Sequence, residues 1–109
     1  MKLLNEILGI KYPIIQGGMA NIATGEFAAA CSNAGALGLI GGGGMRSGDD
    51  LRAHIRRCRE LTDKPFGVNI MLMHPCADEF AQIVIDEKVP VVTTGAGNPG
   101  KYVAKWKEA

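Results

Sequence analysis

The sequence predicts an α/β protein built from parallel β/α units. Four short apolar segments alternate with four segments of helical periodicity, roughly 25 residues apart. The apolar segments lack a regular polar alternation, which is typical of strands buried on both faces of a parallel sheet. Each is bounded by glycine, proline or both. This order predicts right-handed crossovers between neighbouring parallel strands.

The predicted strands are short and rich in β-branched and other apolar residues. They cover residues 13–16 (PIIQ), 37–41 (LGLIG), 66–72 (FGVNIML) and 89–94 (VPVVTT). Because parallel strands end at the same edge of a sheet, the loops that follow them are expected to share one rim.

The first predicted helix follows Thr24, a residue type that caps helix N-termini. Gly35 is a typical C-terminal stop. Between them, apolar side chains recur at the spacing of one helical face. This predicted stripe consists of Phe27, Ala30, Cys31 and Ala34.

The second predicted helix begins with Ser47 and Asp50, which form a capping signal. The run RRCRE (56–60) places arginines in the later turns, where the helix dipole favours them, and is expected to be a solvated face. The expected buried face consists of Leu51, Ile55, Cys58 and Leu61.

The last two predicted helices also begin with recognisable signals. The third opens with the acids Asp78 and Glu79, and the fourth has Asn98 as a natural N-cap followed by Pro99 at the first helical position. Their expected buried residues are Phe80, Ile83 and Val84 in the third helix and Tyr102, Val103, Trp106 and Ala109 in the fourth.

Two architectures fit this order of elements. One is an open doubly wound sheet, and the other is a (β/α)8 barrel, which needs about 250 residues. A chain of 109 residues with four units reaches about half way round such a barrel. No linker or low-complexity segment interrupts it.

Composition excludes several classes of protein. The apolar fraction is 47% and the net charge is +1, so we expect a globular protein without affinity for nucleic acid or an anionic membrane. No apolar run approaches the roughly 20 residues of a membrane-spanning helix. Asn5 and Glu6 also argue against a secretory signal. The odd, widely spaced cysteines predict reduced thiols in the cytoplasm; they are Cys31, Cys58 and Cys76.

Three of the four loops at the expected rim are rich in glycine. The loops read QGGMANIATG, GGGGMRSG, MHPC and GAGNPG. Glycine allows a flat ring or a phosphate to lie against the backbone. A single loop is explained as well by a tight turn, but three loops at one rim favour a ligand site.

The segment GAGNPG (95–100) matches the dinucleotide pattern G-x-G-x-x-G, follows a strand and opens a helix. It lies on the fourth predicted strand rather than the first, and the sequence ends before the position, about 20 residues later, where the pattern has an acidic residue. An open-sheet nucleotide-binding module is therefore the weakest of the functional hypotheses. A helix N-terminus that faces a ligand is the alternative for this segment.

Polar residues in or beside apolar strands are candidates for ligand contacts. Asn69 interrupts FGVNIML, so its amide either bonds to a neighbouring strand or reads the edge of a heterocycle. Gln16 poses the same choice, and Met19 either packs against a planar ligand or fills the core.

We expect the two histidines to lie in different environments. His54 lies on the arginine-rich helix and is expected to be solvated, whereas His74 lies at the rim, where a structural role competes with a role facing the substrate. Cys76 has no second histidine and carboxylate arranged to activate it as a nucleophile. The catalytic residues stay unassigned, and the sequence predicts no metal site.

Several long segments resemble one known family. YPIIQGGMA, GALGLIGGG, TDKPFGVNIML and VVTTGAGNP resemble the N-terminal half of the flavin-dependent enoyl-acyl-carrier-protein (ACP) reductases of type II. They are also similar to the related nitronate monooxygenases, formerly called 2-nitropropane dioxygenases. PFGVNIML followed by TTGAGNP is closer to the reductase branch.

This resemblance implies that residues 1–109 are the N-terminal half of a single FMN-binding (β/α)8 barrel. It implies reduction of trans-2-enoyl-ACP thioesters in fatty-acid synthesis, with NAD(P)H as electron donor; the alternative is oxidation of alkyl nitronates by O2. The implied FMN-binding residues are Gly18, Met19 and Ala20 along the isoalloxazine, Asn69 at its pyrimidine edge, and Gly95, Ala96 and Gly97 at the fourth strand.

The chain departs from the family in one respect. The catalytic histidine and the main phosphate-binding loops of the family lie beyond the fourth helix. A half-barrel has uncovered strand edges, so we expect a homodimer, and a catalytically silent half-barrel that acts only by association is the hypothesis from another class. The expected partner is otherwise a small-molecule or ACP-bound substrate.

Overall fold

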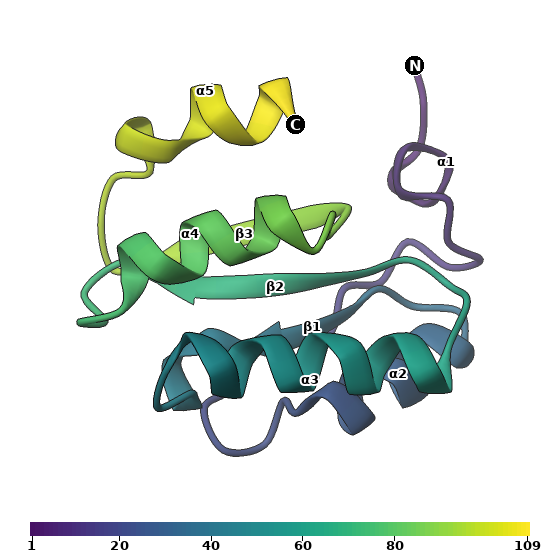
Figure 1. Ribbon diagram of the computed structural model, residues 1–109. Helices are drawn as coiled ribbons and strands as arrows, with labels where there is room; N and C mark the ends of the chain where they lie inside the picture. The colour runs from purple at the N-terminus through teal and green to yellow at the C-terminus, as the bar shows by residue number, and fades with distance from the viewer.

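The structure, a computed structural model, describes residues 1–109 and contains one parallel sheet (Figure 1). Its strands are β1 (Gly38–Gly41), β2 (Phe66–Met71) and β3 (Val91–Gly95), in the order β1-β2-β3. In the register, Asn69 of β2 lies between Gly41 and Thr93 of the neighbouring strands. The predicted parallel β/α order is confirmed.

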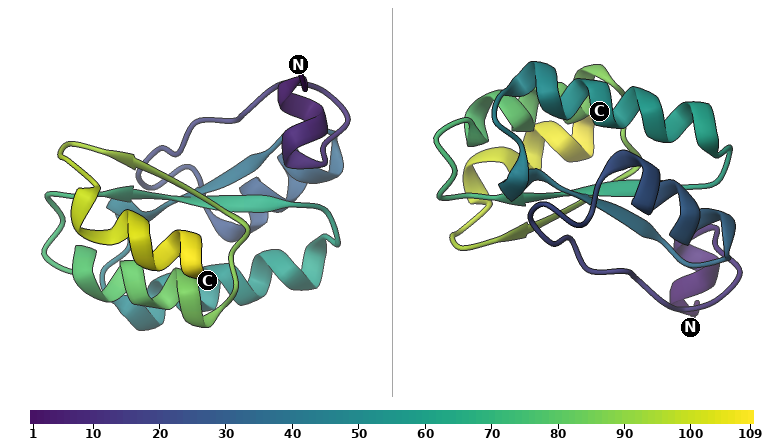
Figure 2. Two further views of the ribbon diagram at one scale, coloured as in Figure 1. Left: turned by 90° about the horizontal axis from the view of Figure 1, so that it is seen from above. Right: turned by 90° about the horizontal axis from the view of Figure 1, so that it is seen from below.

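A helix follows each of the three strands, and two further helices precede β1. They are α1 (Leu4–Leu8), α2 (Gly25–Asn33), α3 (Gly48–Leu61), α4 (Ala77–Asp86) and α5 (Gly100–Glu108), with a 3-10 turn, η1, at Gly42–Gly44. The view from above in Figure 2 shows α3, α4 and α5 on one side of the strands. The short helix α1 was not predicted. None of the helices is both long and apolar enough to cross a membrane.

The first predicted strand, residues 13–16, is reduced to one parallel bridge between Ile15 and Leu37. The N–H of Gln16 makes the last backbone hydrogen bond of this segment to the residues of β1 and its approach, at the carbonyl oxygen of Leu37. The next hydrogen bond is made by the Gln16 side chain instead of the backbone. Gln16 Oε1 accepts a hydrogen bond of 2.9 Å from the N–H of Leu39. The segment therefore stays beside β1 without forming a regular strand.

The core lies between the sheet and its helices. Alternation along β2 directs Phe66, Val68 and Ile70 into this core, while Gly67 and Asn69 belong to the opposite face. The core cluster also contains Ala28 and Ala29 from α2, Ile40 from β1, Leu51, Ile55 and Cys58 from α3, and Phe80, Ile83 and Val84 from α4.

The predicted buried face of α2 is wrong. Phe27 is 39% exposed, and the buried residues are instead Gly25, Ala28, Ala29 and Ser32. The reason is the close approach of the helix to β1, since a β-carbon added at Gly38 would lie 1.9 Å from the carbonyl oxygen of Ala28. Small side chains allow this contact, and a phenylalanine would prevent it.

The buried faces of the later helices are confirmed in part. Leu61 is 40% exposed, although the three other residues predicted for this face of α3 are fully buried. The step from Cys58 to Leu61 turns the helix back by about 60°, which carries Leu61 off the face. In α4 the three predicted residues are buried. In α5 none is buried: Tyr102, Val103 and Trp106 are half-buried and Ala109 is exposed.

Candidate functional site

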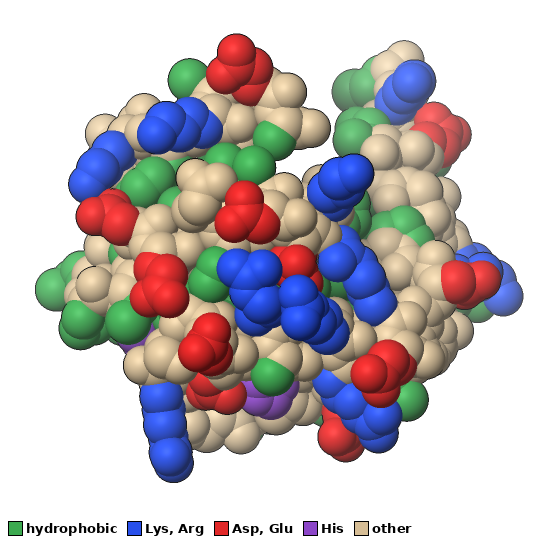
Figure 3. Space-filling view, viewed as in Figure 1, with side chains coloured by type: hydrophobic (Ala, Val, Ile, Leu, Met, Phe, Trp, Pro, Cys, Tyr) green, Lys and Arg blue, Asp and Glu red, His purple; other side chains and the backbone are tan.

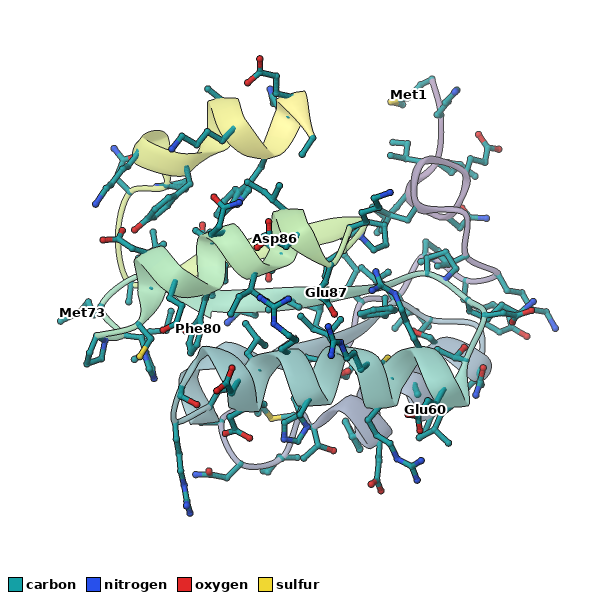
Figure 4. The ribbon with its side chains drawn as sticks, viewed as in Figure 1. Met1, Glu60, Met73, Phe80, Asp86 and Glu87 are labelled. Carbon is teal, nitrogen blue, oxygen red and sulfur yellow. The ribbon has the colours of Figure 1, made fainter.

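The candidate site lies at the rim where the strands end. The loops at residues 16–24, 42–47, 72–76 and 96–99 follow the carboxyl ends of the first bridge and of β1, β2 and β3. Met73, labelled in Figure 4, marks this rim beside the start of α4.

The loop that precedes α2 is fixed to the end of β1. The N–H of Gly41 donates a hydrogen bond of 2.8 Å to the carbonyl oxygen of Ala23. A β-carbon at Gly41 would lie 2.9 Å from the carbonyl oxygen of Met19. The turn from Met19 to Ala23 is therefore held against the sheet, and this holds the adjacent Gly17 and Gly18 at the rim.

The rim glycines fall into two groups. At the first group a β-carbon would collide with a neighbouring loop or with Asn69 of β2, at distances of 2.6 to 2.9 Å. This group consists of Gly18, Gly41, Gly42 and Gly44. A β-carbon at Gly17 or Gly95 would meet no atom within 4 Å. Packing within the protein explains the first group, whereas Gly17 and Gly95 present bare backbone to open space.

Asn69 lies at the centre of this rim. Its Oδ1 accepts a hydrogen bond of 2.8 Å from the hydroxyl of Thr93. Its Nδ2 has no protein partner and is not fully buried. A β-carbon at Gly18 would lie 2.7 Å from the Asn69 β-carbon, so the glycine loop packs directly on this residue. The first predicted alternative is confirmed, because the oxygen bonds to a neighbouring strand, and the role of the nitrogen at the edge of a heterocycle stays a prediction.

The loop after β3 is held in an unusual conformation. Ala96 has φ of 59°, in the left-handed region that residues with a β-carbon rarely adopt. The N–H of Leu72 donates to the carbonyl oxygen of Gly95 over 2.9 Å, which extends the pairing of β2 and β3 into the rim. Gly95 lies in register with Met71, so the GAG segment and Asn69 belong to neighbouring strand ends.

The other residues of the predicted flavin wall lie on the loop between the first bridge and α2. Met19 is 46% exposed, and Ala20 is also exposed. The structure brings Gly18 and Asn69 into contact, and it places Gly95, Ala96 and Gly97 at the end of the adjacent strand.

His74 and Gln16 have structural roles. His74 Nε2 lies 2.8 Å from the carbonyl oxygen of Met45, and its Nδ1 accepts a hydrogen bond of 3.0 Å from the N–H of Cys76. The ring also packs 4.8 Å from that of Phe80. Because Nδ1 is the acceptor, Nε2 carries the proton and donates it to Met45. Both ring nitrogens are therefore occupied within the protein.

The prediction that His54 is solvated is wrong. Its side chain is 29% exposed, and its Nδ1 accepts a hydrogen bond of 3.0 Å from the N–H of Gly25. Because α3 packs across the start of α2, the histidine reaches an amide that the helix itself leaves without a partner.

Three of the helices that begin at the rim, α2, α3 and α5, receive a side-chain acceptor at their first turn. Asn98 Oδ1 accepts from the N–H of Gly100, the first residue of α5, over 2.8 Å, which leaves one fewer N–H for a ligand at the GAGNPG segment. The other caps are Thr24 and His54 on α2 and Ser47 on α3, whereas His74 accepts from the N–H of Cys76, just ahead of α4, and no side chain caps the first turn of α4. Acidic side chains in the first turns of α2, α3 and α4 further disfavour an anion there.

The prediction that RRCRE is a solvated face is confirmed, since its charged residues are all exposed, and its arginines also form ion pairs. Arg56 Nε lies 3.0 Å from Glu87 Oε1, Arg59 bonds to the Glu87 carbonyl, and Arg52 also reaches the Glu87 carboxylate. Figure 3 shows Lys and Arg side chains gathered where α4 and α3 meet, and Figure 4 shows Glu87 between these two helices. By contrast, Arg57 pairs with the exposed Glu60, a hydrogen bond that raises the Arg57 pKa.

Sequence reasoning missed Thr93 as a member of the site. The signal was a polar residue near the end of an apolar strand, as for Asn69, but the register that joins the two is not visible in the sequence. No group of three or more His, Cys, Asp or Glu side chains is placed to hold a metal ion.

Comparison with known proteins adds to this geometry. The profile of the nitronate monooxygenase family matches residues 1–91. The structure of FabK from Thermotoga maritima has a TM-score of 0.93 and 54% identity to this chain, covering 96% of this chain and 33% of FabK. The (3aS,4S,5R,7aS)-5-hydroxy-7a-methyl-1-oxo-octahydro-1H-indene-4-carboxyl-CoA dehydrogenase of Mycobacterium tuberculosis is 36% identical, over 97% of this chain and 30% of its own length. The nitronate monooxygenase of Paraburkholderia phytofirmans is 45% identical, over 73% of this chain and 22% of its own length.

The chain thus spans a third or less of the length of these relatives. Its β/α units are those of the corresponding part of FabK, so the prediction of TIM-type barrel units is confirmed. The profile covers most of the chain, and the described rim is built from residues inside the matched range or directly after it. The chain belongs to the nitronate monooxygenase family.

Proposed function

We propose that this chain forms one wall of the flavin site of an FMN-dependent oxidoreductase. The observation that carries the proposal is the free Asn69 amide nitrogen beside the bare backbone of Gly17 and Gly95, in a chain 54% identical to FabK. When bound, FMN would supply the two-electron chemistry by which NAD(P)H reduces the double bond of a trans-2-enoyl thioester carried by ACP.

The residues present fit the isoalloxazine ring. A flat ring needs backbone without β-carbons where it lies against the protein, and Gly17 and Gly95 offer such backbone. The Asn69 NH2 group would donate to a carbonyl oxygen at the pyrimidine edge. Met19, exposed on the same loop, would pack its polarisable thioether against the ring plane.

Two glycine-rich loops would enclose the isoalloxazine ring in the proposed flavin site. Gly18 and Ala20 would follow the ring on one side, and Gly95, Ala96 and Gly97 would close it on the other. Because side chains cap α2 and α3, and acidic residues lie in the first turns of α2, α3 and α4, this part of the protein would recognise the ring rather than the phosphate.

A comparison of two flavins tests this proposal. We expect the chain to bind FMN and riboflavin with dissociation constants within about threefold, since the phosphate adds no contact here; flavin fluorescence quenching measures both. Asn69→Leu should weaken both by about tenfold or more, because the hydrogen bond to the ring edge is lost. Absence of binding to either flavin contradicts the proposal for this chain.

The reductase branch is favoured by the comparisons. Identity to FabK, a type II enoyl-ACP reductase, is 54% over 96% of the chain, against 45% over 73% for the nitronate monooxygenase. In the whole protein that carries this chain, we expect a crotonyl thioester to drive NAD(P)H oxidation. Oxygen uptake with an alkyl nitronate, and no thioester reduction, would instead support the monooxygenase alternative.

A second candidate function is association without catalysis. A cavity of about 890 Å³ lies along β3 and α5, lined by apolar residues that include Val92, Val103 and Trp106. The β3 edge that faces away from β2 has no paired strand. We propose that a second copy of the chain covers this region as a homodimer. Light scattering after size exclusion should give twice the chain mass, and a monomer at micromolar concentration would contradict it.

We also propose that the protein is cytoplasmic. Cys31, Cys58 and Cys76 are all free thiols, which supports a reducing compartment. Cell fractionation should recover the protein with cytoplasmic markers, and recovery in a secreted fraction would contradict this location.

A further inference from the structure

Asn69 and Thr93 are direct neighbours across the ladder of β2 and β3. They are register partners in this parallel pair, so their side chains share one face of the sheet. Both residues are half-buried. The Thr93 hydroxyl donates to Asn69 Oδ1 over 2.8 Å, and this is the hydrogen bond that the Asn69 side chain makes within the protein.

A side-chain amide has an acceptor end and a donor end, and a neighbour that binds one end decides which end remains free. Thr93 binds the oxygen, which leaves the NH2 group facing the rim. Gly18 packs against the Asn69 β-carbon, and a β-carbon at Gly18 would also lie 3.4 Å from Cγ and 3.5 Å from Nδ2. The loop thus limits the room in which the amide moves.

We propose that Thr93 is a positioning residue that holds the Asn69 amide with its NH2 group toward the ligand. The site then accepts a ligand edge that brings a hydrogen-bond acceptor, such as a ring carbonyl oxygen. A ligand that brings an N–H group to the same point, such as the exocyclic amine of adenine, would place donor against donor. Thr93 thereby contributes to the choice of a flavin ring over an adenine nucleotide.

The identity of the ligand rests on the proposed function, whereas the orientation of the amide is a property of this chain alone. Thr93 and its neighbour Thr94 provide test and control variants. Thr93→Val removes the hydroxyl and keeps the side-chain shape, and Thr93→Ser keeps the hydroxyl. Thr94→Val is the control, because Thr94 lines the cavity beside α5 on the other face of β3.

The first experiment needs no ligand. In the 15N-labelled chain, the Asn69 NH2 signals are identified by their loss in Asn69→Asp, and their exchange with water is measured. We expect both protons to exchange at the rate of an exposed amide, with less than a twofold change in Thr93→Val. If the Asn69 amide were turned so that its NH2 group bonds to Thr93, one NH2 proton of the wild type would exchange with water about tenfold more slowly. Thr93→Val would then restore fast exchange of that proton. That result would overturn the proposal.

The second experiment measures FMN affinity. Thr93→Val should weaken FMN binding by about tenfold, the equivalent of one hydrogen bond, while Thr93→Ser and Thr94→Val stay within about twofold of the wild type. Thr93→Ala repeats the test if the valine variant does not fold. Equal affinity in all variants overturns the positioning role. If the wild type binds no flavin but the exchange result is as expected, the orientation stands and the proposed function fails.

Discussion

Nδ1 of His54, on α3, accepts a hydrogen bond of 3.0 Å from the backbone N–H of Gly25, at the start of α2. We expect His54→Ala to lower the free energy of unfolding by about 1–2 kcal/mol, because the Gly25 amide loses its partner in a half-buried position. His54→Asn should retain most of the stability, since its Oδ1 takes the place of Nδ1. Urea unfolding followed by circular dichroism measures both, and equal losses would show that the hydrogen bond is not the cause.

The two adjacent glycines of the first loop should respond differently to alanine. A β-carbon at Gly18 would lie 2.7 Å from that of Asn69, whereas one at Gly17 would meet nothing within 4 Å. We expect Gly18→Ala to cost about 1–3 kcal/mol of stability, and Gly17→Ala to change it by less than about 0.5 kcal/mol.

The same pair separates packing from ligand contact. If a flat ring lies against Gly17, Gly17→Ala should weaken flavin binding without destabilising the fold. Thermal unfolding and flavin titration of both variants are the measurements. A stable Gly18→Ala protein would contradict the contact with Asn69.

Glu87 and Glu60 form a matched pair of acids on neighbouring helices. The Glu87 side chain is 12% exposed and contacts Arg52 and Arg56, whereas that of Glu60 is 65% exposed and contacts Arg57. We expect Glu87→Gln to cost about 2 kcal/mol, because arginines at a partly buried contact lose their counter-charge. Glu60→Gln should cost less than about 0.5 kcal/mol. Chemical unfolding compares them, and equal effects would contradict the role of burial.

The buried thiol of Cys58 gives the protein an alkaline dependence. Burial raises its pKa from 9.0 to about 11. Below about pH 9 the thiol is protonated in both states, but between pH 9 and 11 only the unfolded state loses the proton. Stability should therefore fall across that range, and by less in Cys58→Ala. Unfolding at stepped pH tests this prediction, and parallel curves for the two proteins would contradict it.

Acid should loosen α5 before the rest of the protein. The hydrogen bond from Tyr102, with the contact from Lys101, holds the Asp78 pKa below its ordinary value of 3.8. A lowered carboxyl pKa contributes stability above 3.8 that is lost as the pH falls through the folded value. Trp106, which donates to the Ala81 carbonyl oxygen from α5, reports this contact by fluorescence.

Asp78→Asn should remove the acid-dependent part of the Trp106 signal. Circular dichroism serves as the control, because the α2–α4 core should persist at the same pH. A fluorescence change of equal size in the variant would show that Asp78 does not link α4 to α5.

The order of strands and helices was predictable because it depends on local patterns. Residues close together in the sequence determine the glycine and proline boundaries, the caps at Thr24 and Ser47, and the apolar stripe of α4. The buried face of α2 was not predictable in this way. It is decided by how closely Gly38 approaches Ala28, a contact between segments that only the packed structure brings together.

The candidate site shows the same limit. Asn69 was predictable as a polar residue in an apolar strand, and the glycine loops pointed to the rim. Which glycines the protein itself requires, and that Thr93 holds the Asn69 oxygen, depend on register and loop contacts. His54 was misjudged because its acceptor role needs an amide from a helix 29 residues earlier in the sequence.

The contacts between successive units have a consequence for how the protein is made. His54 closes the start of α2, His74 reaches back to Met45 ahead of α3, and Glu87 fastens α3 from the end of α4. Each unit is thus completed by a side chain supplied later in the sequence. As the chain leaves the ribosome, a β/α unit gains these contacts only after the next unit has emerged, so we expect each unit to be less stable until the following one is made.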